Sequence, residues 1–270
     1  METIGVTGVG GGVGQSIIKA LQPSGHRIVG MDGEVLGAGL YAVDRGYTVP
    51  YANAPGYIER VLDVCRDNGV RLLFPGLDAE LYPLSEHRER FAAIGTTVVV
   101  SSRDVIDVSE NKLLTFERLT ALGFHVPQTY VLETTRPQLE YPFIVKPYLG
   151  GARSKDVFLV KHAADFDAAV RAAGDRRSRF IAQAYLPGDE FTCGTVTVGD
   201  RCRGAIVMKR ELRAGDTYKC SVVRDQALEE HLVAVMNALQ PEAETISMTM
   251  GSSPCGDNAG FGAGRSPFIA

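Results

Sequence analysis

A lysine and a glycine-rich stretch between two apolar runs are the residues of this chain best suited to bind an anion. The segment Tyr141–Val160 reads YPFIVKPYLGGARSKDVFLV. Its candidate residues are Lys146, Gly150, Gly151, Ser154 and Lys155. The pattern predicts strand, glycine-rich turn, strand. Glycines let the backbone approach an anion closely, with N–H groups pointing at it, and the lysine adds positive charge. We interpret the segment as a phosphate clamp.

The clamp differs from a P-loop in two ways. The spacing GxxxxGK[ST] is absent, and the second apolar run follows the glycines where a P-loop would have a helix. A hairpin with a glycine turn and solvated charges is the alternative interpretation.

The elements that position this segment begin with an alternation of strands and helices over the first hundred residues. Apolar runs predict strands at 3–6, 27–31, 70–74 and 96–100, and helical periodicity predicts helices at 15–21, 56–68 and 81–91. Such an alternation is typical of a parallel sheet with helices on both faces.

A second glycine-rich stretch, Thr7–Gly14, lies between the first strand and the first helix. Gly10 and Gly11 are followed about 20 residues later by Asp32, which a dinucleotide fold would place on a ribose hydroxyl. The glycines do not fit GxGxxG, so the stretch also suits close packing of strand and helix.

Two further acids follow the predicted strand at 70–74. Asp78 and Glu80 lie where parallel strands end, and they could line a substrate crevice with Asp32. Solvated loop acids are the alternative for each.

The second part of the chain begins after a polar segment, 101–109, which we interpret as a domain link. Helices are predicted at 110–122, 163–173 and 227–239, a strand at 179–182, and a hairpin of 195–198 with 203–207 across Gly199-Asp200. The segment 209–219, KRELRAGDTYK, is basic.

Charge and composition exclude several classes of partner. The chain has 270 residues, a net charge of −4 and a pI of about 5.8, so no general attraction to nucleic acid or to an anionic membrane is expected. The N-terminus lacks the features of a secretory signal, and no run of about 18 apolar residues occurs. The five cysteines have no metal-ligand spacing. We expect a cytoplasmic protein with reduced thiols.

Several motifs occur in a characteristic order. Asn111-Lys112 begins a helix, Phe143–Pro147 precedes the glycine-rich turn, and Gln183–Glu190, QAYLPGDE, follows about 30 residues later. Together they resemble the ATP-grasp superfamily, and most closely its branch similar to the carbamoyl-phosphate synthase large subunit. The resemblance extends from residue 1 to about 239.

The resemblance implies a fold and a domain order. Residues 1–105 would form a Rossmann-like pre-ATP-grasp α/β domain with a parallel sheet. Residues 106–182 would form the N-terminal ATP-grasp lobe with the glycine-rich lid, and residues 183–270 the C-terminal α+β lobe.

The resemblance also implies roles for individual residues. Lys112 and Lys146 would contact the α- and β-phosphates of ATP, and Gly150–Lys155 would cover them. Ala184, Tyr185 and Leu186 would supply the backbone edge that reads adenine, with Gln183 near the adenine amino group and Glu190 on the ribose. Lys209, Arg210 and Arg213 would be the catalytic residues that face the γ-phosphate or the acyl-phosphate.

The implied activity is that of an ATP-dependent carboxylate–amine ligase with ATP and Mg²⁺ as cofactors. A small-molecule carboxylate would be activated as an acyl-phosphate for attack by an amine or ammonia. By analogy with the family, the enzyme would be a homodimer. Carboxyphosphate chemistry, as in carbamoyl-phosphate synthesis, is an alternative. An ATP-binding module without catalysis and an NAD-linked oxidoreductase are two others.

The C-terminal sequence departs from this family. The family expects Glu-x-Asn-x-Arg among its metal ligands, whereas this chain reads PEAETISMTMGSSPCGDNAGFGAGRSPFIA, so the metal-binding residues are unknown. The tail shows no apolar periodicity, and its acids Glu242, Glu244 and Asp257 sit in no strand pattern. One hypothesis is a shifted reading frame, since EAETISMTMG back-translates to a neighbouring frame that reads RGRNYQYDDG. A natural truncation with a disordered tail is the alternative.

Overall fold

The computed structural model describes residues 1–150, 156–213, 216–239 and 247–255 of the 270-residue chain. Most of the chain divides into two compact units. Unit 1 is built mainly from Met1–Ile106, and unit 2 mainly from Asp107–Val196 and the residues after Arg201. Each unit has its own sheet and core, so each is described by itself.

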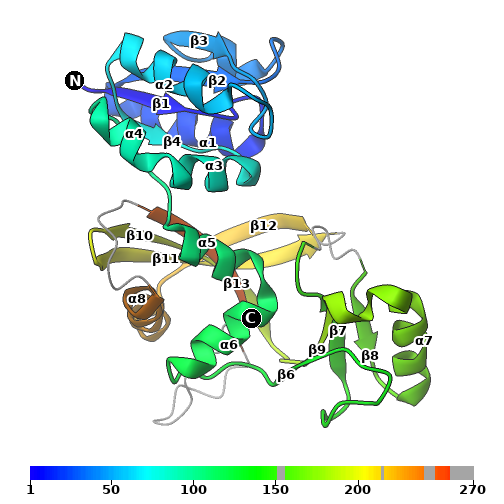
Figure 1. Cartoon of the computed structure of the whole chain (residues 1–270). Helices are drawn as coiled ribbons and strands as arrows, with labels where there is room; N and C mark the ends of the chain where they lie inside the picture. The colour runs from blue at the N-terminus through cyan, green and yellow to red at the C-terminus, as the bar shows by residue number, and fades with distance from the viewer. Residues whose placement is uncertain (151–155, 214–215, 240–246, 256–270) are drawn as a thin grey trace. The chain divides into compact units, whose positions relative to one another are not determined.

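Unit 1 contains a five-stranded sheet in the order β3-β2-β1-β4-β5 (Figure 1). Its strands are β1 (Thr3–Val6), β2 (Arg27–Asp32), β3 (Arg45–Thr48), β4 (Val70–Phe74) and β5 (Thr97–Val98). All four neighbouring pairs are parallel. The helices are α1 (Gly12–Leu21), α2 (Tyr57–Asn68), α3 (Leu81–Glu86) and α4 (Arg88–Ala93). The predicted parallel α/β domain is therefore confirmed.

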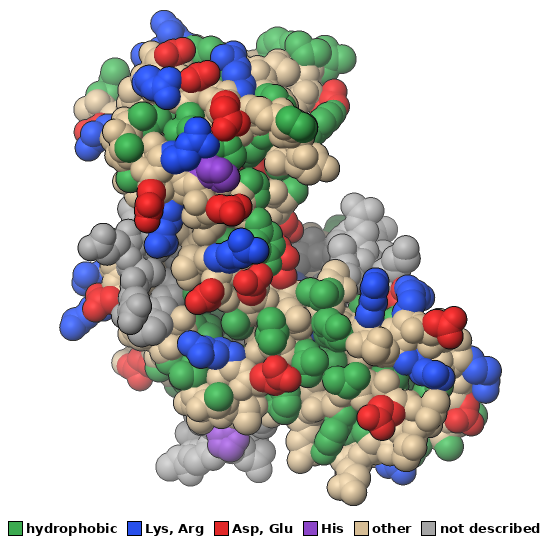
Figure 2. Space-filling model, viewed as in Figure 1, with side chains coloured by type: hydrophobic (Ala, Val, Ile, Leu, Met, Phe, Trp, Pro, Cys, Tyr) green, Lys and Arg blue, Asp and Glu red, His purple; other side chains and the backbone are tan. Residues whose placement is uncertain are grey.

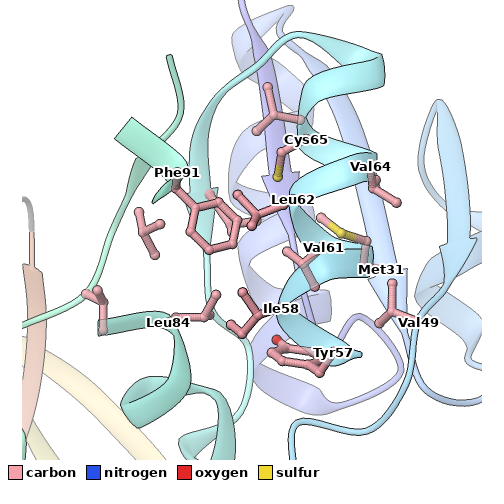
Figure 3. Close-up of a cluster of buried hydrophobic side chains, with 14 of the residues drawn as sticks. Met31, Val49, Tyr57, Ile58, Val61, Leu62, Val64, Cys65, Leu84 and Phe91 are labelled. Carbon is pink, nitrogen blue, oxygen red and sulfur yellow. The ribbon is translucent and has the colours of Figure 1, made fainter. Parts of the chain in front are cut away.

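The largest core cluster of unit 1 forms around α2. Tyr57, Ile58, Val61 and Leu62 are at most 7% exposed and recur at helical spacing on one side of α2. Figure 3 shows Phe91 of α4 beside Leu62. Burial of one such side chain contributes about 1.5–3 kcal/mol, so this cluster holds α2 and α4 on the unit.

Some predicted boundaries in unit 1 differ from the structure. The predicted helix over 81–91 is two helices, α3 and α4, and the predicted strand at 96–100 is paired only over Thr97–Val98. Strand β3 was not predicted, because Arg45–Thr48 is a short edge strand with mostly exposed residues and no apolar alternation.

The predicted polar link at 101–109 contains the boundary between the two units, at Ile106 and Asp107, but it also contains a helix that was not predicted. Residues Arg103–Glu110 form helix α5, with Val105 and Ile106 buried. Two adjacent apolar residues in a polar segment are too few to show helical periodicity, and their burial is a tertiary effect. Helix α6 (Lys112–Ala121) follows, and the side chain of Asn111 caps it by accepting from the N–H groups of Leu113 and Leu114.

One sheet of unit 2 has the order β6-β9-β7-β8 and pairs antiparallel throughout. It consists of β6 (Thr129–Val131), β7 (Phe143–Pro147), β8 (Phe158–Val160) and β9 (Phe180–Ala184), with helix α7 (Ala163–Ala173) beside it (Figure 1). The two predicted strands are confirmed by β7 and β8, and residues 151–155 between them lie outside the described residues. Phe143, Val145 and Phe180 pack with Phe166 and Ala169 of α7, so one face of the sheet is the core of this lobe.

The other sheet of unit 2 has the order β12-β11-β10-β13. It consists of β10 (Asp189–Val198), β11 (Arg201–Arg213), β12 (Asp216–Val223) and β13 (Ser247–Cys255), and α8 (Gln226–Leu239) follows β12. The predicted hairpin is thus much longer than 195–198 with 203–207, and the basic segment 209–219 belongs to β11 and β12.

Strand β13, which was not predicted, lies in the tail and joins the sheet beside β10. Sheet pairing uses backbone groups, so a segment without apolar alternation can add to an edge strand. Glu242, Glu244 and Asp257 lie outside the described residues.

The described surface carries mixed charge. On the face shown in Figure 2, Lys and Arg side chains alternate with Asp and Glu over the elements of unit 1. Within the described ranges, no helix is long and apolar enough to cross a bilayer.

Candidate functional site

The strand β7 places Lys146 on the side of its sheet away from the core. Phe143 and Val145 are fully buried against α7, and the pleat turns Ile144 and Lys146 to the opposite face. Antiparallel register sets Lys146 opposite Ile181 of β9. The alternation of the sequence FIVKP therefore decides where the ammonium group lies.

Burial and a second lysine lower the pKa of Lys146 to about 8. Burial is the larger cause, and the positive charge of Lys112 acts in the same direction. The carboxylate of Glu190 opposes both effects. Burial also lowers the pKa of Lys112. We call Lys112 and Lys146 the lysine pair; their mutual repulsion would be relieved by an anion.

The lysine pair is tied to the start of the glycine-rich turn. Lys112 Nζ donates to the carbonyl oxygen of Gly150 at 2.8 Å, and its backbone N–H donates to Tyr148 at 2.9 Å. A β-bridge joins Asn111 to Leu149. The N-terminus of α6, where helix N–H groups favour negative charge, therefore lies against the end of β7.

Glu190 and Arg210 form an ion pair on the second sheet of unit 2. Arg210 Nη2 lies 2.9 Å from Glu190 Oε1, and the two side chains are 18% and 31% exposed. Arg210 Nη1 also donates to Thr192 Oγ1 at 3.2 Å. Within the described residues, the buried Nε of Arg210 has no partner. Arg210 thus retains a donor for a further ligand.

The structure separates Lys209 from Arg210. These neighbours in β11 point to opposite faces of the sheet, and Lys209 Nζ lies 2.5 Å from Asp189 Oδ2. Both side chains of that pair are about half exposed. Arg213 ends β11, and its side chain is outside the described set.

The end of β9 presents the segment predicted to read a base. Gln183 is buried, and its Nε2 donates to Thr129 Oγ1 at 2.9 Å. The N–H of Ala184 donates to Gln128 at 2.9 Å, after which β9 ends. Tyr185 is 44% exposed and Leu186 follows it beyond the strand. Sequence reasoning missed Thr129 and Thr192, although Thr192 lies two residues from Glu190, on the same face of β10.

Three of the five residues of the predicted clamp are not described by the structure. Gly151, Ser154 and Lys155 lie outside the described residues, whereas Gly150 has a left-handed φ of 68° that favours glycine.

In unit 1, the carboxylate of Asp32 is occupied by backbone donors. The N–H of Gly10 donates to Oδ2 at 2.6 Å, and the N–H of Glu34 donates to Oδ1 at 2.8 Å. The N–H of Gly11 is taken by the carbonyl of Gly8 at 3.0 Å. Asp32 therefore links the glycine stretch after β1 to the loop after β2.

Glu80 and Asp78 differ sharply in environment. Glu80 is 3% exposed and accepts from Thr7 Oγ1 at 2.6 Å, from Tyr57 at 2.9 Å, and from the N–H groups of Gly76 and Leu77. Burial raises the pKa of Glu80, and these hydrogen bonds oppose that shift. Asp78 is exposed. Glu80 therefore joins the residue after β1, helix α2 and the loop after β4.

No metal centre is evident in the part of the chain that the structure describes. It contains no group of three or more His, Cys, Asp or Glu side chains placed to hold an ion. Cys65, Cys193, Cys202 and Cys220 are free thiols.

Comparison with family models decides the classification. Residues 109–244 match the model of the ATP-grasp domain, and residues 6–99 match the PylC-like, N-terminal domain. This chain belongs to the ATP-grasp family. The predicted resemblance to the superfamily is confirmed, and the matched model for the N-terminal part is the PylC-like one.

Solved structures agree with the ATP-grasp fold. The ADP complex of purK, an N5-carboxyaminoimidazole ribonucleotide synthetase, superposes with a TM-score of 0.72 at 15% identity, over 94% of this chain and 67% of that one. An L-amino acid ligase from Bacillus licheniformis gives 0.62 at 14% identity, over 95% and 64%.

A third structure was determined with a nucleotide. The biotin carboxylase domain dimer of the Hydrogenobacter thermophilus 2-oxoglutarate carboxylase, in complex with MgADP, ADP and bicarbonate, gives a TM-score of 0.64 at 14% identity, over 95% of this chain and 61% of that one. At such identities the likeness shows the fold alone. The chain spans about two thirds of the length of these structures. No curated protein matches it.

Proposed function

We propose that this chain is an ATP-dependent ligase that activates a small-molecule carboxylate as an acyl-phosphate for attack by an amine or ammonia. The observation that carries the proposal is the lysine pair. Two partly buried ammonium groups, each with a lowered pKa, lie beside a glycine turn at a helix N-terminus. Perturbed groups of like charge are expected where an anionic substrate supplies the missing countercharge.

The geometry suggests where each part of ATP would bind. Lys112 and Lys146 would neutralise the α- and β-phosphates. Beyond the end of β9, Tyr185 and Leu186 would present backbone groups to the adenine. The donor side of the Gln183 amide is already engaged, so its carbonyl oxygen suits the adenine amino group.

Glu190 and Arg210 would lie at the ribose and at the transferring phosphoryl group. The Glu190 carboxylate can accept from two ribose hydroxyls, and the free Nε of Arg210 can donate to a phosphate oxygen. Lys209 points to the opposite face of the sheet. Its positive charge would therefore act on the phosphates only at long range, without direct contact. Arg213 and the segment from Gly151 to Lys155 keep their predicted roles as proposals.

The proposed reaction has two balanced steps. A carboxylate oxygen attacks the γ-phosphorus, the bond from that phosphorus to the bridging oxygen breaks, and ADP leaves. The amine nitrogen then attacks the acyl carbon, phosphate leaves, and the nitrogen loses a proton. Phosphoryl transfer asks the protein mainly for positioning and charge neutralisation, which lysines and an arginine supply.

The described residues contain no group of three or more acidic side chains placed to hold Mg²⁺, and Glu242, Glu244 and Asp257 lie outside them. We therefore derive no step that passes through the metal. A second candidate is an ATP-binding module with impaired catalysis, because the sequence lacks the Glu-x-Asn-x-Arg that the family places among its metal ligands. Carboxyphosphate chemistry of the kind found in carbamoyl-phosphate synthesis belongs to the same reaction class. The oxidoreductase alternative is weakened, because both carboxylate oxygens of Asp32 already accept hydrogen bonds.

Titration calorimetry of ATP and of NAD, with and without Mg²⁺, tests the proposal. We expect wild type to bind ATP and not NAD, and Lys146→Ala to weaken ATP binding at least tenfold. Lys161→Ala, an exposed lysine just after β8, is the control and should leave the affinity unchanged. Binding of NAD alone would overturn the proposal. ATP binding without turnover for any carboxylate and amine would favour the binding module.

A further inference from the structure

A cavity of about 590 Å³ opens beside the end of β7. Its lining residues are Pro147, Tyr148, Leu149, Asp156, Arg176, Arg179 and Phe180. Pro147 and Phe180 are register partners, so their side chains share the α7 side of the sheet, whereas Lys146 and Ile181 share the other side. Neither Lys112 nor Lys146 lines the cavity.

The charges around the cavity do not balance. Arg176 and Arg179 bring two guanidinium groups, and Asp156 is the one acid among the lining residues. Asp156 Oδ2 lies 3.5 Å from Arg176 Nη1. Among the described residues, the side chain of Arg179 has no recorded hydrogen bond or ion pair, although its carbonyl accepts from the N–H of Tyr148 at 3.1 Å. The lining thus carries one uncompensated positive charge.

The floor of the cavity is apolar. Phe180 is 2% exposed, and the guanidinium carbon of Arg176 lies 5.7 Å from the centre of its ring. Leu149 is 52% exposed although it is a large apolar residue. Apolar walls with a few convergent polar groups are typical of small-molecule pockets. An exposed leucine beside an unpaired arginine favours a ligand with both an apolar body and an anionic group.

We propose that this cavity binds a small monocarboxylate with an aromatic or branched apolar body. The carboxylate lies between the guanidinium groups of Arg179 and Arg176, where planar donors match its two oxygens. The apolar body covers Leu149, Pro147 and the edge of Phe180.

Occupancy of the cavity is linked to the lysine pair. Tyr148 and Leu149 line the cavity, and Lys112 donates hydrogen bonds to the carbonyl groups of Tyr148 and Gly150 in the same segment. A ligand that shifts this segment changes the position of the Lys112 ammonium group. The linkage, unlike the cavity itself, rests on the proposed function, and it must be reciprocal between the two ligands.

Benzoate is the probe for the cavity. A ligand-observed NMR titration of the full chain should show saturable binding that weakens at least fivefold in Arg179→Gln and in Arg176→Gln. Arg177→Gln alters the same basic segment without lining the cavity, and it should bind benzoate as wild type does. Leu149→Asp, at an exposed position, should abolish binding without loss of folding. Equal affinity across all variants would overturn the proposal, and so would inorganic phosphate or acetate that binds as well as benzoate.

The linkage is tested by ATP titrations with and without saturating benzoate. We expect the ATP affinity of wild type to change at least twofold and that of Arg179→Gln to stay the same. An unchanged affinity in wild type would refute the linkage. Absence of ATP binding would overturn the proposed function and the linkage with it, whereas the benzoate titration decides the cavity by itself.

Discussion

Arg210 on β11 and Glu190 on β10 form an ion pair of 2.9 Å, while their chain neighbours Lys209 and Asp189 form a second pair on the other face of the sheet. The inner pair is mostly buried and the outer pair is about half exposed. Two pairs of the same chemistry, one residue apart, therefore differ in environment. Variants of the two pairs can therefore be compared to test whether the buried pair contributes more to the stability of unit 2.

Glu190→Gln should destabilise unit 2 by about 1–3 kcal/mol, because it leaves a partly buried guanidinium without its carboxylate. Asp189→Asn should change the free energy of unfolding by less than about 0.5 kcal/mol, as expected for an exposed pair. Urea unfolding of the two variants at pH 7 measures both values. Equal effects would show that burial does not distinguish the pairs.

The affinity for ATP should fall as the pH rises from 7 to 9. Lys146 has a pKa of about 8, so its ammonium form dominates at pH 7 and is largely lost at pH 9. The affinity for ATP should therefore fall roughly tenfold between pH 7 and pH 9, since one pKa unit corresponds to about 1.4 kcal/mol. Lys146→Arg stays charged over this range, so its affinity for ATP should be flat. A fall of the same size in Lys146→Arg would assign the pH dependence to another group.

Lys146→Met should raise the free energy of unfolding at pH 7, by on the order of 1 kcal/mol, while it removes ATP binding. The folded-state pKa of Lys146 is lowered, so the unfolded chain binds more protons between about pH 8 and the ordinary lysine pKa. The free energy of unfolding of the wild type therefore rises with pH through that window. The difference in free energy of unfolding between Lys146→Met and the wild type should shrink accordingly. Urea titrations at pH 7 and pH 10 check both parts. A gain that is constant with pH would contradict this account.

Gly14→Ala should destabilise unit 1 by about 3 kcal/mol or more, because a Cβ at this position would lie 2.4 Å from the carbonyl oxygen of Gly8. Gly12→Ala meets no atom within 4 Å and should be neutral or stabilising by about 0.5–1 kcal/mol. Thermal unfolding of both variants tests whether the glycines serve close packing. A tolerated alanine at position 14 would reject the packing role.

Glu80→Gln should destabilise unit 1 by roughly 2 kcal/mol. The carboxylate of Glu80 accepts hydrogen bonds from two backbone N–H groups, and an amide NH₂ in its place would leave those donors without an acceptor. Asp78→Asn, at an exposed position, is the control and should have no measurable effect. ATP binding should be the same in both folded variants. Loss of ATP binding in Glu80→Gln with unchanged stability would return Glu80 to the substrate side.

Local patterns in the sequence were sufficient for most elements of both units. The strands 3–6 and 70–74 and the helix 163–173 have the predicted bounds, because their apolar residues recur with the period of a strand or a helix. The same reasoning placed Lys146 on a strand between buried residues. Strand β3, helix α5 and strand β13 lack such periodicity, so they could not be predicted from it.

The sequence by itself determined the order of the elements, the family and the residue types available for chemistry. The tertiary structure decided which side chains act together. Asp78 and Glu80 look alike in sequence, yet one is exposed and the other accepts four hydrogen bonds from three separate segments. Arg210 reaches Glu190 because of strand register, which sequence spacing does not specify. The physical reason is that periodicity reports on local backbone geometry, whereas burial and pairing depend on segments that are distant in the chain.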